Sequence, residues 1–136
     1  MKKILVALLM CHCGAKESTD PMDKLATELM HGCGKELSVG VSVGELEDKC
    51  LGVCIRVLMS NNTEIRAITI SPKVLGMTID EQTTVMAHEL GHCEALKPEG
   101  YGLMNPVLEV RPAAQAQQEL CELLKPIKPT FHEMLD

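Results

Sequence analysis

Residues 78–93 read TIDEQTTVMAHELGHC, and this stretch predicts a helix whose start and buried side are both visible in the sequence. Thr78 and Glu81 have the spacing of a capping box, in which the threonine hydroxyl accepts a hydrogen bond from the Glu81 amide and the Glu81 carboxylate reaches back to the Thr78 amide. After them, apolar residues recur at helical spacing and predict the side of the helix that faces the core. Those residues are Val85, Met86, Leu90 and Cys93.

The same helix carries a His-Glu-x-x-His string at residues 88–92. Residues four positions apart share one face of a helix, so His88 and His92 can present two imidazoles to one tetrahedral zinc ion. Glu89 is poorly placed as a third ligand of that ion, but it can accept a proton from the zinc-bound water and donate it to a leaving amine. The pattern therefore predicts a zinc site with Glu89 as its general base.

The alternative interpretation is an exposed helix with two solvated histidines and a structural Glu89. By ordinary residue frequencies, such a string arises by chance in on the order of one chain in several hundred of this length. That interpretation leaves Gly91 unexplained, because glycine inside a helix costs about 1 kcal/mol relative to alanine. The glycine predicts that a neighbouring segment packs closely against the helix backbone at this position.

Upstream of this helix, the sequence predicts one further helix and several strands. Asp20 and Pro21 stand at the N-cap and first position of a helix over about residues 21–31, with Gly32 as its end. Apolar residues then alternate with period two, which predicts strands, and Asn61-Asn62 predicts a tight turn between the last two strands. The predicted strands cover residues 37–43, 51–57 and 65–70.

Downstream, a last helix is predicted after Pro112, with Leu120, Leu123 and Leu124 on its apolar side. The order helix, strands, helix, loop, helix predicts an α+β fold with a small mixed sheet, the zinc-binding helix and a C-terminal helix. A chain of 136 residues, 46% of them apolar, has room for one domain, which we expect over residues 14–136. With no Trp, one Phe and one Tyr, aliphatic packing must supply the core.

The first residues have the features of an export signal. Met1-Lys2-Lys3 precede an apolar run over residues 4–10 that is too short to span a bilayer. Leu8-Leu9-Met10-Cys11 is similar to a bacterial lipobox, although that pattern has a small residue where Met10 stands. We expect residues 1–13 to be a signal peptide or lipoprotein signal, with membrane attachment through a lipidated Cys11. The alternative is a buried N-terminal strand.

Seven cysteines favour an oxidising compartment over the cytosol. With Cys11 as an anchor, the others can form three bridges, whose pairing is open. Cys93 points away from the two histidines, so it is either a packing residue or half of a bridge, with Cys121 as a candidate partner. The cysteines available for bridges are Cys13, Cys33, Cys50, Cys54, Cys93 and Cys121.

Residues 85–92, followed by Gly102-Leu103-Met104-Asn105-Pro106, resemble the zinc helix and Met-turn of the metzincins, with the matrixins as the closest well-known branch. The resemblance covers roughly residues 64–125. It implies that residues 65–70 form the edge strand beside the active site and that a peptide substrate lies antiparallel to that strand. It also implies that Met104 forms the floor of the zinc site.

The third zinc ligand departs from the metzincin pattern, which has Gly and a third His where this chain has Ala95 and Pro98. Catalytic zinc usually takes three protein ligands, and Glu99, one residue past the expected position, is the candidate. Tyr101 can either contact the zinc or the developing oxyanion, or pack against the Met-turn. Other donors left open are Glu94, Glu109, Glu119, Glu122, His31 and His132, and a glutamate on the last helix would make the site gluzincin-like.

These patterns predict a zinc-dependent metalloendopeptidase that hydrolyses peptide bonds of a protein or peptide substrate, with Glu89 activating the zinc-bound water. A competing interpretation is a non-catalytic zinc-binding envelope or interaction protein with a structural metal site. A third is a regulatory peptidase that cuts a single partner. The net charge of -6, without a basic run longer than Lys2-Lys3, disfavours nucleic-acid binding. We expect an exported monomer, either secreted or lipid-anchored in the cell envelope.

Overall fold

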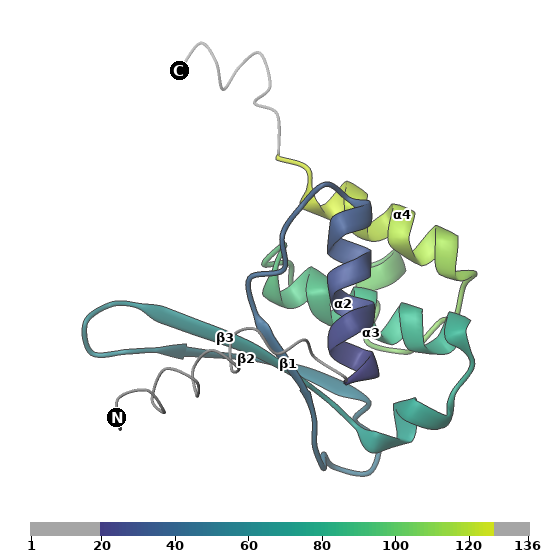
Figure 1. The fold of residues 1–136 in the computed structure, drawn as a ribbon, viewed down its shortest axis with the longest axis horizontal. Coiled ribbons are helices and arrows are strands. Elements are labelled where there is room, and N and C mark those ends of the chain that lie inside the picture. The colour runs from purple at the N-terminus through teal and green to yellow at the C-terminus, as the bar shows by residue number, and fades with distance from the viewer. Residues whose placement is uncertain (1–19, 127–136) are drawn as a thin grey trace, which may run out of the picture.

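The computed structural model describes residues 20–126, which form an α+β fold with one small sheet (Figure 1). The predicted signal over residues 1–13, including Cys11, lies outside the described residues. Helix α2 contacts β1, α3 contacts β2 and β3, and α4 packs on α3. The elements follow the predicted order: α2 (Pro21–Gly32), β1 (Gly40–Val43), β2 (Gly52–Leu58), β3 (Glu64–Ile70), η1 (Pro72–Gly76), α3 (Ile79–Cys93), η2 (Gly102–Met104) and α4 (Ala113–Leu124).

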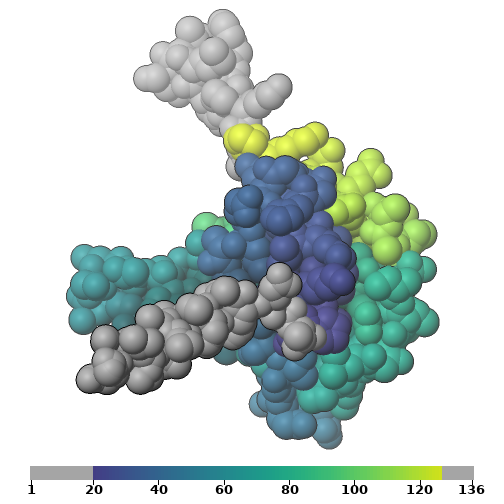
Figure 2. All heavy atoms as spheres, viewed as in Figure 1, coloured from purple at the N-terminus to yellow at the C-terminus, as the bar shows by residue number. Residues whose placement is uncertain are grey.

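The sheet has the strand order β1-β3-β2, with β3 parallel to β1 and antiparallel to β2. The prediction that residues 65–70 form an edge strand is therefore wrong. The tight turn, with Asn62 in a left-handed conformation at φ 69°, pairs β3 with β2 on one side, and β1 occupies the other side. The edge strands are β1 and β2, α3 contacts β2 as well as β3, and the β2–β3 hairpin extends beyond the helices (Figures 1 and 2).

Most helix boundaries agree with the sequence predictions because local side-chain caps determine them. Asp20 accepts a hydrogen bond from the Met22 amide at 2.8 Å, and α2 begins at the next residue, Pro21. Both hydrogen bonds of the capping box between Thr78 and Glu81 are present at the start of α3. The first strand begins later than predicted, at Gly40.

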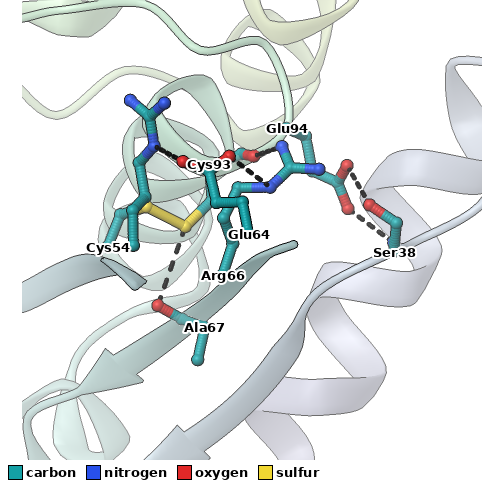
Figure 3. A network of polar contacts seen from close by, with 8 residues as sticks. Ser38, Cys54, Glu64, Arg66, Ala67, Cys93 and Glu94 are labelled. Carbon is teal, nitrogen blue, oxygen red and sulfur yellow. Dashed lines mark hydrogen bonds and ion pairs between the residues drawn. A yellow bond between two sulfur atoms is a disulfide. The ribbon is translucent and has the colours of Figure 1, made fainter. Parts of the chain in front are cut away.

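Ser38 explains the late start of β1. Its amide and hydroxyl both donate to the Glu94 carboxylate at the end of α3, at 2.6 and 2.7 Å (Figure 3). The backbone amide of Ser38 is therefore bonded to a side chain rather than to the sheet. This contact ties the entrance of β1 to the C-terminal end of α3.

The core is built from aliphatic side chains and methionine, as the composition predicts. It lies between the sheet and α3, and it continues between α3 and the helices α2 and α4. Leu90 of α3 is fully buried, on the apolar side of the helix that the sequence predicted. The largest fully buried side chains of the described residues are Met22, Met30, Ile68, Ile70, Met86, Leu90 and Leu120.

Two disulfides connect elements that are distant in sequence: Cys33 with Cys121, and Cys54 with Cys93. The suggested pairing of Cys93 with Cys121 is wrong. Cys93 lies on the side of α3 that faces the sheet, so it meets β2, whereas Cys121 on α4 meets the end of α2. Figure 3 shows the Cys54–Cys93 bridge beside Arg66, whose guanidinium donates to the Cys93 carbonyl.

Two disulfides are typical of proteins from an oxidising, exported environment. Cys50 has a free thiol, which lies 3.3 Å from the Gly52 carbonyl oxygen. Within residues 20–126, none of the helices is long and apolar enough to cross a membrane.

Removing the Cys33–Cys121 bridge should lower the free energy of unfolding by about 2 to 5 kcal/mol, because it closes a loop of 88 residues in the unfolded chain. The measurement is urea unfolding of the Cys33→Ala/Cys121→Ala protein against the wild type. Cys50→Ala is the matched control, and removal of this free thiol should cost less than about 1 kcal/mol. Equal losses in the two proteins would contradict the stabilising role of the bridge.

Candidate metal centre

Three side chains converge at the C-terminal half of α3: those of His88, His92 and Glu99. The two Nε2 atoms lie 3.1 Å apart. The Glu99 carboxylate places Oε1 3.2 Å from His88 Nε2 and Oε2 3.4 Å from His92 Nε2. The structure thus brings the predicted third ligand to the two histidines, and this group could hold a metal ion.

Each histidine is oriented by a backbone carbonyl on its other nitrogen. His88 Nδ1 lies 2.7 Å from the Leu103 oxygen, and His92 Nδ1 lies 2.7 Å from the Lys97 oxygen. A carbonyl can only accept, so each Nδ1 carries the hydrogen, and each imidazole can present an Nε2 lone pair to a metal ion. Two Nε2 atoms and a carboxylate face one another, and a cation between them would stabilise this arrangement.

The spacing of these donors fits a small tetrahedral ion. Nitrogen and oxygen donors about 2.0 to 2.2 Å from such an ion lie roughly 3.3 to 3.6 Å from one another. The separations among His88, His92 and Glu99 are between 3.1 and 3.4 Å. The two distances to Glu99 involve different oxygens of its carboxylate, and one donor atom from each of the three residues lies within 4.8 Å of the others.

The end of α3 explains how Glu99 reaches the histidines. The Lys97 amide donates to the Gly91 oxygen at 2.9 Å, while Leu96 adopts a left-handed conformation at φ 56°. This turn ends the helix and directs the Lys97 carbonyl toward His92. The Gly100 amide then bonds to the Met104 oxygen, which holds the loop that carries Glu99.

Gly91 is the position of close approach that the sequence predicted. A Cβ atom there would clash with the Sδ of Met104 and would lie 3.3 Å from a methyl group of Leu123. Met104 is 4% exposed, and η2, which contains it, contacts α3. The glycine thus lets η2 approach closely enough for the Leu103 carbonyl to hold His88.

Glu89 is buried beside the three donors, with 5% of its surface exposed. Within residues 20–126, its Oε1 atom has no hydrogen-bond partner. Burial, and secondly the nearby Glu99 carboxylate, raise the pKa of Glu89 to about 7. A buried acceptor with a near-neutral pKa is suited to exchanging a proton with a molecule that enters the site.

Two cavities flank the donors, and Gly52, Glu89 and Glu99 line both of them. The cavity beside His88 has a volume of about 430 Å³, and that beside His92 about 390 Å³. Gly52 makes room for the Glu89 side chain, since a Cβ there would lie 2.9 Å from the Glu89 Cγ. The metal donors therefore stand in a cleft along the start of β2.

Several sequence candidates lie away from this group. Tyr101 is 96% exposed and lines neither cavity, so the structure gives it neither the oxyanion role nor packing against the Met-turn. Glu109 lines the larger cavity but is not one of the three donors. His132 lies outside the described residues. The remaining alternatives have other partners: Glu94 binds Ser38, Glu119 binds Arg111, Glu122 binds Lys125, and His31 binds Glu36.

Sequence reasoning missed two residues that shape the cleft. Gly52 had a usable signal, because a glycine within an alternating apolar run marks a close approach of another group. Arg111, which lines the larger cavity, had none, since its position depends on a contact with Thr84 far away in the sequence.

No protein-family model, curated protein or solved structure matches this chain. The fold and the site define an α+β protein with a His-His-Glu group that could hold a metal ion.

Proposed function

We propose that this protein is a zinc-dependent metalloendopeptidase in which His88, His92 and Glu99 hold the metal. The observation that carries the proposal is the convergence of these three donors beside a buried glutamate, in a cleft along the edge of a sheet. Two imidazoles and one carboxylate are a common ligand set of catalytic zinc. The resemblance of residues 85–92 and 102–106 to metzincins supports the same assignment.

The bound metal and Glu89 have separate roles in hydrolysis. Bound zinc supplies a Lewis acid that polarises a peptide carbonyl and lowers the pKa of water. Glu89 accepts a proton from the attacking water as the new carbon–oxygen bond forms. Glu89 then donates that proton to the amine nitrogen as the carbon–nitrogen bond breaks. The Oε1 atom that lacks a partner is available for this transfer.

The open edge of β2 supports an extended polypeptide as the substrate. Among the described strands, β2 pairs only with β3, so its other edge is free for main-chain hydrogen bonds. Gly52 at its start lines both cavities beside the metal donors. A peptide added to this edge would pass over the metal centre, with side chains entering the cavities.

The non-catalytic alternative has less support. A structural zinc site usually has four protein ligands, whereas this group has three donors within the described residues. Burying Glu89 without a partner for Oε1 is costly and brings no benefit to a purely structural site. An open coordination position next to a buried base fits catalysis better.

We place this peptidase outside the cytosol, secreted or attached to the envelope through Cys11. The two disulfides support export, and the sequence features of residues 1–13 support a signal. Mass spectrometry of the exported protein would identify its first residue and any lipid on Cys11.

The proposal predicts cleavage of an unfolded protein by the purified zinc-loaded chain. A chelator should abolish this activity, and added zinc should restore it. Zinc content, measured in the same samples, should be close to one ion per chain. The absence of bound zinc would refute the proposal. Full zinc occupancy without cleavage of unfolded proteins would instead favour a structural site or a peptidase restricted to one partner.

A further inference from the structure

Arg111 is a cation at the larger cavity that the proposed mechanism does not use. Its side chain is 11% exposed, and it lines the same cavity as His88 and Glu89. The Arg111 amide donates to the Thr84 hydroxyl at 3.3 Å, so its backbone is held against α3. A mostly buried Arg111 side chain therefore lines a cavity that adjoins the candidate metal donors.

The hydrogen-bonding capacity of this guanidinium is largely unused. It has five N–H donors, of which one, on Nη1, bonds to the Glu109 carbonyl at 2.6 Å. Nε lies 3.4 Å from a Glu119 carboxylate oxygen but makes no hydrogen bond, although it is buried. Nη2 makes no hydrogen bond within residues 20–126 and is not among the buried atoms, so it remains able to bond to an acceptor on a ligand.

The remaining cavity walls determine the shape of that ligand. Val85, Leu103 and Leu108 provide an apolar lining, and about 430 Å³ is ample for one long side chain. The exposed side chains of Glu47, Lys49 and Glu109 also line the cavity. The lining therefore suits an apolar stem that ends in an oxygen acceptor.

We propose that this cavity is the specificity pocket of the peptidase and that it takes a glutamate or glutamine side chain next to the scissile bond. Arg111 is then the specificity-determining residue. This inference rests on the proposed function, because the cavity adjoins the metal donors and Glu89. The shared chemistry of the two side chains is an apolar stem and a terminal oxygen that accepts hydrogen bonds from the guanidinium.

At the Arg111 end of the cavity, the local charge explains why both side chains fit and why a basic one does not. The cavity as a whole is lined by four glutamates, Glu47, Glu89, Glu99 and Glu109, beside the two cations Lys49 and Arg111. Glu119 offsets part of the Arg111 charge, so a neutral amide oxygen can serve as well as a carboxylate. A lysine side chain would bring a second cation to the guanidinium. A leucine side chain would fill the stem region but offer no acceptor to the Arg111 guanidinium.

The test uses two sets of peptides that are otherwise identical. In one set the residue before the cleaved bond is Glu, Gln, Leu or Lys, and in the other set the residue after that bond is varied in the same way. For the zinc-loaded wild type, kcat/KM should be at least about 10-fold higher for Glu and Gln than for Leu and Lys at one of the two positions. Arg111→Met should remove this preference and favour Leu. Arg56→Met, which removes the guanidinium beside the other cavity, should leave the preference unchanged.

A binding measurement separates this inference from the proposed function. The dissociation constants of the same peptides are measured with the zinc-loaded Glu89→Gln protein and with the Glu89→Gln/Arg111→Met double variant. Circular dichroism first shows that each variant is folded, and zinc analysis shows that it is loaded with metal. Preferential binding of Glu and Gln peptides without cleavage by the wild type would uphold the pocket and favour a structural site or a peptidase restricted to one partner. Cleavage without any such preference would overturn the pocket alone, and failure of every peptide to bind would overturn both.

Discussion

Replacing Glu89 with glutamine should slow peptide hydrolysis by about 10²- to 10⁴-fold while zinc content stays at the wild-type level. The amide has nearly the shape of the carboxylate but cannot accept the proton of the attacking water. Glu89 is not one of the three metal donors, so their geometry should remain. The measurement is kcat/KM with one peptide substrate, alongside zinc stoichiometry, for both proteins.

The stability of this variant provides an internal control. Burial raises the pKa of Glu89 from 4.5 to about 7. Between these two pH values the folded chain holds a proton that the unfolded chain has released. The free energy of unfolding of the metal-free wild type should therefore fall as the pH rises through this interval. Glutamine has no charge to bury, so Glu89→Gln should lack this loss. A variant that keeps its zinc and hydrolyses peptides at the wild-type rate would exclude Glu89 as the base.

Replacing either histidine of the metal group should weaken zinc binding by more than about 100-fold. Even residues that only hydrogen-bond to a metal ligand typically change metal affinity by about 10- to 100-fold when they are mutated. His88→Ala and His92→Ala each remove one of three donors, and Glu99→Gln removes the charge of the third. The measurement is competition for zinc with a chelator of known affinity. Hydrolysis should fall together with zinc occupancy.

His31→Ala is the matched control for these variants. His31 lies at the end of α2 with an exposed side chain 3.4 Å from Glu36, and it is not part of the metal group. Its replacement should leave zinc affinity unchanged. If Glu99→Gln bound zinc as tightly as the control, Glu99 would not be the third ligand, and a donor outside this group would have to be sought.

Local sequence patterns were sufficient to predict where the helices start and to predict half of the candidate metal site. The cap at Asp20 and the capping box at Thr78 involve residues within a few positions of each other, so their contacts form wherever that segment becomes helical. The pairing of His88 with His92 on one face follows from helix geometry in the same way. Gly91 also indicated a close neighbour without identifying it.

The choice of Glu99 as third donor could be suggested by the sequence but not decided by it. Several acidic residues and histidines were equivalent by type, and the metzincin pattern has a different residue nearby. The decision depends on the turn after α3, where Leu96 adopts φ 56° and the Lys97 carbonyl bonds to His92. Such a conformation is a property of the packed loop and is not expected from a leucine.

Tertiary structure alone decided the strand order, the disulfide pairing and the residues around the cleft. Alternation predicts that a segment is a strand but not which strands lie beside it, so the edge was assigned to residues 65–70 when it belongs to β2. Cys93 meets Cys54 because of the side of α3 on which it lies, and Arg111 reaches the cavity through Thr84. The sequence by itself determined the helices, their caps and the two histidines, because contacts over a few residues form these. The third donor, the free edge and the cation at the cavity depend on contacts between distant segments, which exist only once the chain has packed.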